Sequence, residues 1–403
     1  VMSYEILTPS SVIPYILSIP TLKDFFETKE LTVDEIGDGN LNYVYLLKSA
    51  NNPKKALIVK QAVPYLRCVG ESFPLSRTRM NYEIRALETF YKRSSEVIPK
   101  VYYANEEMSL VVMQYLDNHI ILRYGLIEGI KYPRLSDAIS TYLANSLFYT
   151  SSLYLQSAEK RALMDRFNSN TELCKLSEEF VFTTAYMQDE TNDNENVKDN
   201  PLAKKLFEDM EFKEKVLGLK YQFMTQSDAL LHGDLHTGSL MLNEQECYII
   251  DPEFAFVGPF GFDIGALIAN FVNAYIHHKI INSNHEYEKW LLDIIESILE
   301  KFEEKFLDLW NKTENSALVK SGFLDVETLS HYKKIFMLKI VQQTVGYAGC
   351  EMARRVFGVA GVAEIRGISD KEKRAKAEEM ALSIARKFVM NHEKISSIKE
   401  IKG

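Results

Sequence analysis

The sequence has few cysteines and no excess of positive charge. Cys68, Cys174, Cys247 and Cys350 are the four cysteines in 403 residues, and no two of them form a CxxC pair. This spacing predicts neither a zinc site nor a disulfide framework, and it favours a reducing compartment. The 56 Asp and Glu residues exceed the 47 Lys and Arg residues, which leaves a net charge of −9. That balance disfavours a general binder of nucleic acid or of anionic membranes.

Long apolar runs are also missing. No run reaches the roughly 18 residues that a membrane span needs, and residues 1–21 hold three prolines without a basic segment followed by an apolar core. We therefore expect neither secretion nor a membrane span, and we expect a cytoplasmic protein. With 46% hydrophobic and 26% charged residues the composition is globular, which excludes a disordered or fibrous chain.

The character of the chain changes after about residue 127, and we place the boundary between a first part, residues 31–115, and a second part, residues 116–403, shortly before that change. Residues 31–115 contain short β-rich runs and one helical stretch, which predict a small sheet carrying a helix at 79–91. Residues 116–403 contain long amphipathic segments, which predict a mainly helical region with helices over 136–155, 289–309 and 331–355. We expect residues 1–30 to form a helical N-terminal extension and the polar residues 183–201 to form a surface loop.

The strongest motif is the run His-Gly-Asp-Leu-His at 232–236, followed by an apolar run at 248–250 and then by Asp251-Pro252-Glu253. One carboxylate after a short apolar run and two more after the next run indicate that three carboxylates converge. Phosphoryl transfer to a hydroxyl needs one carboxylate to orient or deprotonate the attacking oxygen, and others to hold the magnesium that bridges the phosphates. Asp234 fits the first task, and Asp251 with Glu253 fit the second.

Upstream residues suggest a nucleotide site. Gly37 and Gly39 lie between short β runs, where they form an ordinary hairpin turn or let the backbone approach phosphates closely. Lys60 ends an apolar strand, where it is either an exposed edge lysine or the lysine that pairs with the α and β phosphates. Its expected partner on the following helix is Glu83, with Glu88 as the alternative, and either glutamate could instead be a solvated helix residue.

An apolar strand at 110–113 runs into a polar connection. In a kinase, adenine is bound there by backbone groups, which here belong to Gln114 and Leu116. A plain interdomain linker accounts for the same residues, and the two interpretations are compatible.

The runs 232–239, 251–256 and 258–265, taken together, resemble the 5-methylthioribose kinases, which belong to the same group as the aminoglycoside and choline kinases. The resemblance extends to residues 37–42, 63–79 and 354–355, and so covers roughly residues 30–365. It implies an α+β fold of the two-lobed protein-kinase-like type, with a small β-rich N-terminal lobe and a larger, mainly helical C-terminal lobe. It also implies ATP and Mg²⁺ as cofactors, a homodimer, and transfer of a phosphoryl group to the 1-hydroxyl of 5-methylthioribose in methionine salvage.

The resemblance assigns roles to the acidic residues. It implies that Asp234 is the catalytic base that orients the 1-hydroxyl, and that Asp251 and Glu253 hold magnesium. Glu253 takes over the task of an asparagine that protein kinases carry at the position of Ser239. Asp263 is implied to brace the catalytic loop, although an N-cap of a helix beginning near residue 264 explains it almost as well.

The resemblance also implies substrate contacts. Arg354 and Arg355 would contact the sugar and the transferring phosphoryl group, although arginines at a helix C-terminus also need no ligand. Such a pair is unhelpful to a cationic acceptor such as choline or an aminoglycoside. Asn40 is implied to contact the nucleotide and Asn42 the substrate. Phe73 stands where the family usually has a tryptophan, so an apolar contact is retained but an indole N–H is lost.

Two other functions remain open from the sequence. The first is a kinase of the same fold that acts on another small alcohol of the aminoglycoside, choline or homoserine type, which a panel of substrates distinguishes. The second is a nucleotide-binding pseudoenzyme. A pseudoenzyme is expected to have lost one of Lys60, Asp234 and Asp251, and all three are present.

Overall fold

The computed structural model describes residues 4–36, 41–66, 70–192, 201–281 and 283–402, and the chain divides into two compact units. Unit 1 comprises residues 1–119 and 248–255, and unit 2 comprises residues 120–247 and 256–403. The segment 248–255 joins unit 1 because it packs there, with the Ile249 amide donating to the Val97 carbonyl at 2.8 Å. From the sequence we expected this segment within the helical region, because composition does not show that the chain passes back into unit 1 at these residues.

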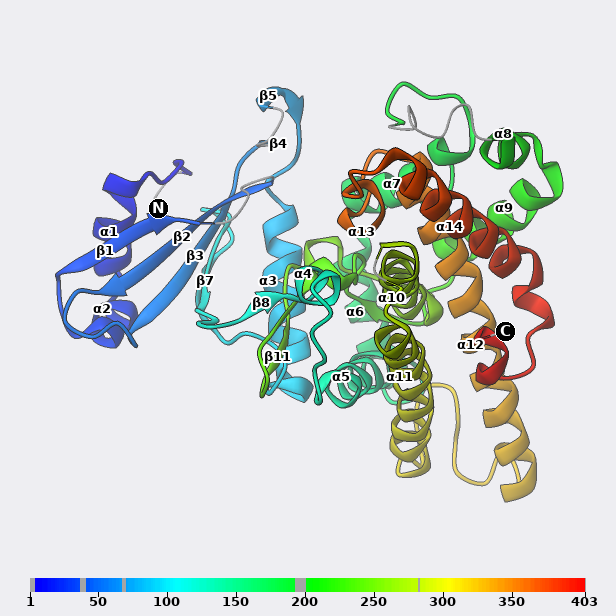
Figure 1. Cartoon of the computed structure of the whole chain (residues 1–403). Coiled ribbons are helices and arrows are strands. Elements are labelled where there is room, and N and C mark those ends of the chain that lie inside the picture. Colours follow the sequence, from blue (N-terminus) through cyan, green and yellow to red (C-terminus); the bar gives the residue numbers. More distant parts are fainter. Residues whose placement is uncertain (1–3, 37–40, 67–69, 193–200, 282, 403) are drawn as a thin grey trace. The chain divides into compact units, whose positions relative to one another are not determined.

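Unit 1 is built on an antiparallel sheet with five strands among the described residues, in the order β1-β2-β3-β7-β6 (Figure 1). These strands are β1 (Leu31–Glu35), β2 (Asn42–Ser49), β3 (Ala56–Ala62), β6 (Val101–Asn105) and β7 (Leu110–Gln114). The other elements of unit 1 are α1 (Pro9–Ser18), α2 (Pro20–Phe26), β4 (Tyr65–Leu66), β5 (Gly70–Pro74), α3 (Arg79–Ser94) and the short turn η3 (Pro252–Phe254). The strands and the helix predicted between residues 31 and 115 are confirmed.

The central strand β3 carries two polar residues in a buried position. Six of its seven residues are buried, so its two polar residues must find partners inside the protein. Gln61 donates to the carbonyls of Glu5 and Met108 and accepts from the Leu7 amide at 2.9 Å. This ties the N-terminal segment to the sheet, where α1 and α2 share an apolar core with β2, β3 and β7. Lys60 is the other polar residue.

Unit 2 is mainly helical, which confirms the expected fold class of a small β-rich part and a larger helical part. Its helices are α4 (Leu122–Ile127), α5 (Leu135–Tyr149), α6 (Ser157–Asn168), α7 (Thr171–Phe180), α8 (Pro201–Glu208), α9 (Met210–Thr225), α10 (Gly261–Ile281), α11 (His285–Asn311), α12 (Val326–Phe357), α13 (Ala363–Arg366) and α14 (Lys371–Asn391). Short strands β8 (Ile120–Ile121) and β10 (Leu240–Leu242) pair with each other, as do β9 (Ala229–Leu231) and β12 (Phe256–Gly258). No helix of the described residues is long and apolar enough to span a membrane.

Two long helices, α10 and α12, approach each other closely through glycine. A Cβ on Gly265 would lie 2.6 Å from the Thr344 carbonyl oxygen and 2.9 Å from the Ala348 amide nitrogen. Only glycine therefore allows this distance between the two backbones. The two helices carry acidic and basic residues of unit 2 that are described below.

The helix predicted over residues 136–155 is shorter in the structure, because α5 ends at Tyr149. The hydroxyls of Thr150 and Ser151 bond to backbone groups within one turn, and such local bonds compete with helical hydrogen bonds. In the segment expected to be a polar loop, a short turn η1 (Thr184–Tyr186) buries Ala185 and Tyr186. Residues 193–200 lie outside the described part.

Candidate active site

A buried lysine on β3 contacts two carboxylates of unit 1. Lys60 Nζ donates to Glu83 Oε1 at 2.9 Å and to Asp251 Oδ1 at 2.6 Å. Glu83 projects from α3 and its side chain is fully buried, whereas the Asp251 side chain is 50% exposed. The alternative partner, Glu88, is exposed on α3. We call Lys60, Glu83, Asp251 and Glu253 the lysine–carboxylate cluster.

Burial and charge oppose each other in the lysine–carboxylate cluster. Burial by itself lowers the pKa of Lys60, but the Asp251 and Glu83 carboxylates outweigh it and hold this pKa above its ordinary value. Burial raises the pKa of Glu83, which Lys60 opposes only in part, and burial also raises the pKa of Glu253. The ammonium group is therefore charged at neutral pH.

The donor chemistry of Asp251 and Glu253 fits Mg²⁺. This ion is usually held by one or two protein carboxylates, while water and substrate phosphates complete its coordination. Asp251 has a φ of 61°, an uncommon left-handed conformation that turns the chain from β11 (Cys247–Ile249) into η3. Within the described ranges no group of three or more His, Cys, Asp or Glu side chains is placed to hold a metal. Two protein carboxylates are a number that suits a metal shared with phosphates.

A buried arginine that was not predicted as a site residue, Arg79, contacts Asn42, Leu41 and Glu253. Arg79 is 2% exposed, and its Nη2 donates to Asn42 Oδ1 at 2.9 Å and to the Leu41 carbonyl at 3.0 Å. Its Nε lies 3.6 Å from Glu253 Oε2, to which Asn42 Nδ2 also donates at 3.5 Å. Asn42, expected at the substrate, thus lies beside an expected metal ligand. A charged residue at the start of a helix gives no sequence signal of burial, because such residues are usually exposed.

In unit 2, the loop after β9 carries Asp234. Gly233 has a φ of 83°, which suits glycine in the tight turn. Asp263 Oδ2 accepts from the His232 amide at 2.6 Å, and Oδ1 accepts from the Gly233 amide at 3.0 Å. Asp263 lies in the first turn of α10, which begins at Gly261, so the N-cap alternative is wrong and the bracing of this loop is present. Ser239 Oγ donates to the Asp234 carbonyl at 2.8 Å and thereby closes the loop.

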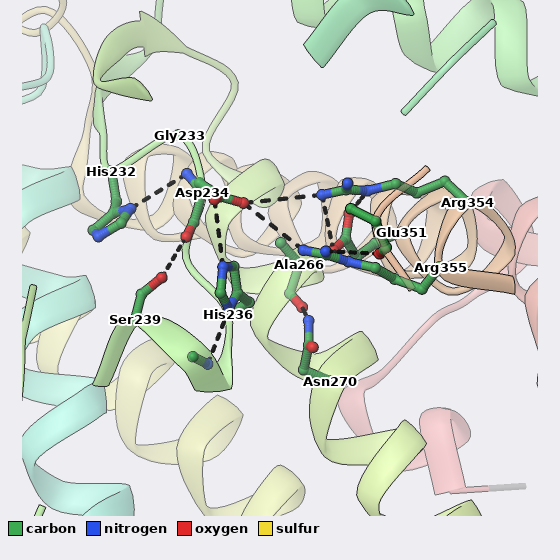
Figure 2. A network of polar contacts seen from close by, with 12 residues as sticks. His232, Gly233, Asp234, His236, Ser239, Ala266, Asn270, Glu351, Arg354 and Arg355 are labelled. Carbon is green, nitrogen blue, oxygen red and sulfur yellow. Dashed lines mark hydrogen bonds and ion pairs between the residues drawn. The ribbon is translucent and has the colours of Figure 1, made fainter. Parts of the chain in front are cut away.

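Two arginines from the end of α12 face the Asp234 carboxylate (Figure 2). Nη2 of Arg354 and Nη2 of Arg355 each lie 3.9 Å from Asp234 Oδ1. Glu351, one turn earlier on α12, accepts from the Nε of both arginines at 2.7 Å. We call Asp234, His236, Glu351, Arg354 and Arg355 the aspartate–arginine cluster. Glu351 Oε1 also accepts from Arg354 Nη2 at 3.2 Å, so Glu351 holds both guanidinium groups beside Asp234.

The charges of the aspartate–arginine cluster keep both carboxylates ionised. Burial by itself raises the pKa of Asp234, but His236, Arg355 and Arg354 outweigh it and hold this pKa well below its ordinary value. The same two arginines outweigh burial at Glu351 and lower its pKa to about 2. A carboxylate stabilised to this degree is a weak base. It is suited to orient a hydroxyl and to accept its proton late in a transfer.

Neither Glu351 nor His236 is among the site residues predicted from the sequence. For Glu351 a signal existed, because a glutamate three and four residues before two arginines places all three on one helix face. For His236 the signal was its position two residues after Asp234. In both cases the motif was visible, but the contacts depend on how α12 meets the loop after β9.

The remaining expected site residues are placed as follows. Gln114 ends β7, where its side chain donates to the Tyr248 hydroxyl at 3.3 Å, and Leu116 is buried just beyond this strand. Phe73 lies on β5 and is 41% exposed. The segment with the expected nucleotide-binding residues Gly37, Gly39 and Asn40 lies outside the described residues.

The fold is that of a phosphotransferase. The chain matches the model of the phosphotransferase enzyme family over residues 32–278 and belongs to this family. Within it, the chain is 37% identical to methylthioribose kinase 1 of Oryza sativa subsp. japonica, over 98% of this chain and 94% of that one. It is 40% identical to a methylthioribose kinase of Geobacillus sp., over 99% of this chain and 95% of that one. It is 41% identical to a methylthioribose kinase of Bacillus cereus, over 98% of this chain and 96% of that one. The chain therefore belongs to the methylthioribose kinases.

Among solved structures, a choline kinase from Cryptosporidium parvum aligns over 94% of this chain and 96% of its own, with 14% identity and a TM-score of 0.46.

Proposed function

We propose that this chain transfers the γ-phosphoryl group of ATP to the 1-hydroxyl of 5-methylthioribose, giving ADP and 5-methylthioribose 1-phosphate in methionine salvage. Relatives named methylthioribose kinase that match nearly the full chain support the substrate. The observation that carries the chemistry is Asp234, with Arg354 and Arg355 each 3.9 Å from its Oδ1. One carboxylate beside two fixed cations suits a neutral hydroxyl that attacks an anionic phosphoryl group.

Asp234 would act on the acceptor. Its carboxylate accepts a hydrogen bond from the 1-hydroxyl, whose oxygen forms the new bond to the γ-phosphorus while the bond from that phosphorus to the β–γ bridging oxygen breaks. The hydroxyl proton passes to Asp234, and ADP leaves with the bond's electron pair. The guanidinium groups of Arg354 and Arg355 would donate to the transferring phosphoryl oxygens, on which negative charge is concentrated in the transition state.

The lysine–carboxylate cluster would act on the nucleotide. Lys60 would donate to the α and β phosphates and Glu83 would hold its ammonium group in place, as the 2.9 Å hydrogen bond between them supports. Asp251 and Glu253 would hold Mg²⁺, which supplies positive charge to the phosphates when it is bound. In the same proposal, backbone groups of Gln114 and Leu116 bind adenine, and Gly37, Gly39 and Asn40 contact the phosphates. Asn42 and Phe73 would face the sugar.

A kinase that acts on a cationic alcohol is the second candidate, and the two arginines argue against it. A choline or aminoglycoside acceptor brings positive charge, which two guanidinium groups near the attacking oxygen would repel. A neutral sugar carries no such penalty. We also propose a cytoplasmic homodimer, which the wide cysteine spacing and the family resemblance support.

The test is ADP release from ATP, measured with and without Mg²⁺, using 5-methylthioribose beside ribose, choline, homoserine and an aminoglycoside. We expect Mg²⁺-dependent turnover on 5-methylthioribose alone. Turnover on another alcohol only would retain the catalytic residues and reject the substrate. No turnover with any alcohol, while ATP still binds, would instead favour a pseudoenzyme.

A further inference from the structure

His236 lies between Asp234 and a buried arginine of α4, Arg123. Its Nε2 is 3.3 Å from Asp234 Oδ2, and its Nδ1 is 3.2 Å from Arg123 Nη2. Figure 2 shows the imidazole ring directed at the carboxylate. The two ring nitrogens therefore face groups of opposite character, a carboxylate on one side and a guanidinium on the other.

The proton on this ring can be assigned from its partners. Nδ1 receives a hydrogen bond from the Gly238 amide at 2.9 Å as well as the contact from Arg123. Both partners are donors, and a guanidinium group has no acceptor atom, so Nδ1 must be the unprotonated nitrogen. A neutral imidazole then carries its proton on Nε2, where it points at Asp234 Oδ2.

Arg123 cannot turn away from His236 without breaking two other hydrogen bonds. Its Nη1 donates to Glu364 Oε2 at 2.9 Å, and its Nη2 donates to Asn270 Oδ1 at 3.1 Å. Glu364, on α13, is fully buried, and Asn270, on α10, is itself tied to the Ala266 carbonyl at 2.7 Å. Groups on two further helices thus fix the guanidinium group and, through it, the ring.

A doubly protonated ring is disfavoured at this position. A proton on Nδ1 would point at the Gly238 amide and at a guanidinium group. Burial lowers the pKa of His236, and the charges of Arg355 and Arg123 lower it further, while Asp234 alone opposes them. The ring is neutral at pH 7, and its single tautomer follows from the hydrogen bonds.

We infer that His236 is a positioning residue, which holds Asp234 through a fixed Nε2–H tautomer set by Arg123. The Nε2 contact at 3.3 Å is made to Oδ2 and leaves Oδ1, the oxygen nearest Arg354 and Arg355, for the acceptor hydroxyl. The catalytic consequence rests on the proposed function, whereas the tautomer does not. Misplacing a catalytic group by about 1 Å costs on the order of 10²-fold in rate.

The tautomer is tested directly by NMR of the full chain labelled with ¹⁵N-histidine. The shift of each ring nitrogen reports whether it carries a proton, and the His236→Gln variant identifies the signals by their loss. We expect an unprotonated Nδ1 and a protonated Nε2 from pH 6 to 8. A proton on Nδ1, or a ring that titrates within this range, would overturn the inference whatever the enzyme's substrate is.

The positioning role is tested by two substitutions at this residue. His236→Met removes the donor, and we expect kcat to fall about 10²-fold with KM for both substrates changed by less than about twofold. His236→Gln keeps an N–H near the Nε2 position, and we expect it to restore most of kcat. The matched control is His285→Gln, an exposed histidine at the start of α11, which should leave kcat unchanged. Equal losses in kcat for His236→Met and His236→Gln, or full activity of His236→Met, would contradict the positioning role.

Discussion

The two units hold charge in opposite ways. In unit 1 the buried Lys60 contacts two carboxylates directly, Glu83 and Asp251, and the buried Arg79 lies 3.6 Å from Glu253. In unit 2 a single carboxylate, Asp234, faces Arg354 and Arg355. The proposed function adds a cation to the first arrangement and an anion to the second. In that proposal a metal nucleotide and a transferring phosphoryl group would supply these two charges.

The distances within the two clusters differ as well. Lys60 makes contacts of 2.6 and 2.9 Å, so in the proposed function a nucleotide would compete with them for its ammonium group. In unit 2, Glu351 takes the short contacts with the arginines at 2.7 Å, while Asp234 lies 3.9 Å from them. The structural role and the chemical role are therefore carried by different carboxylates in unit 2. In unit 1 Asp251 combines both, because it contacts the lysine and is an expected metal ligand.

Replacing the carboxylate at the centre of unit 2 has the largest expected effect. Asp234→Asn keeps the size of the side chain but cannot accept the hydroxyl proton, and we expect kcat to fall by roughly 10³- to 10⁴-fold. ATP binding, measured by calorimetry, should persist because the lysine–carboxylate cluster is intact. A variant that keeps kcat within tenfold of the wild type would show that Asp234 is not the group that orients the hydroxyl.

Replacing the cation at the centre of unit 1 tests the other side of the comparison. Lys60→Met leaves Glu83 and Asp251 without their cation, and breaking a buried pair in this way costs about 3–5 kcal/mol of unfolding free energy. We expect weaker ATP binding, and a lower melting temperature that Mg²⁺ partly restores. The control is Lys54→Met, an exposed lysine just before the same strand. A stability equal to that of the control would show that the cluster does not need its lysine.

Glu351→Gln removes the carboxylate that holds both arginines. Because the folded-state pKa of Glu351 is lowered to about 2, its stabilisation is present above its unfolded pKa near 4.5 and is lost as pH falls toward 2. Urea unfolding at pH 7 should show a loss of roughly 3 kcal/mol in the variant, and this loss should shrink at pH 3. Glu304→Gln, an exposed glutamate on α11, provides the control. A deficit that does not depend on pH would contradict the assignment of the charge.

The smallest expected effect concerns Glu83, whose pKa shifts in the opposite direction. Burial raises its pKa, so the folded state binds a proton more readily than the unfolded state, and stability falls as pH rises through this range. Glu83→Gln should remove this part of the slope of unfolding free energy between about pH 5 and 8. Glu88→Gln, on the same helix but exposed, should leave the slope unchanged. Identical slopes in all three proteins would contradict a raised pKa.

Short contiguous motifs explain why much of the site was predictable. Asp234, Asp251 and Glu253 each follow a short apolar run, and Lys60 lies near the end of another, so strand and turn chemistry place them without long-range information. The sheet strands and the long helices α11 and α12 were predictable for the same reason, since their periodicity is local. The end of α5 was missed because serine and threonine hydroxyls outcompeted an otherwise helical pattern.

The sequence by itself determined which functional groups this protein contains: a lysine on a buried strand, carboxylates after short strands, and two arginines at the end of a helix. Only the tertiary structure decided how these groups are held. It selected Glu83 over Glu88, buried Arg79 beside Glu253, and placed His236 between Asp234 and a distant arginine. The physical reason is that burial and pairing of a charge depend on contacts between residues far apart in the chain, and no local pattern records them.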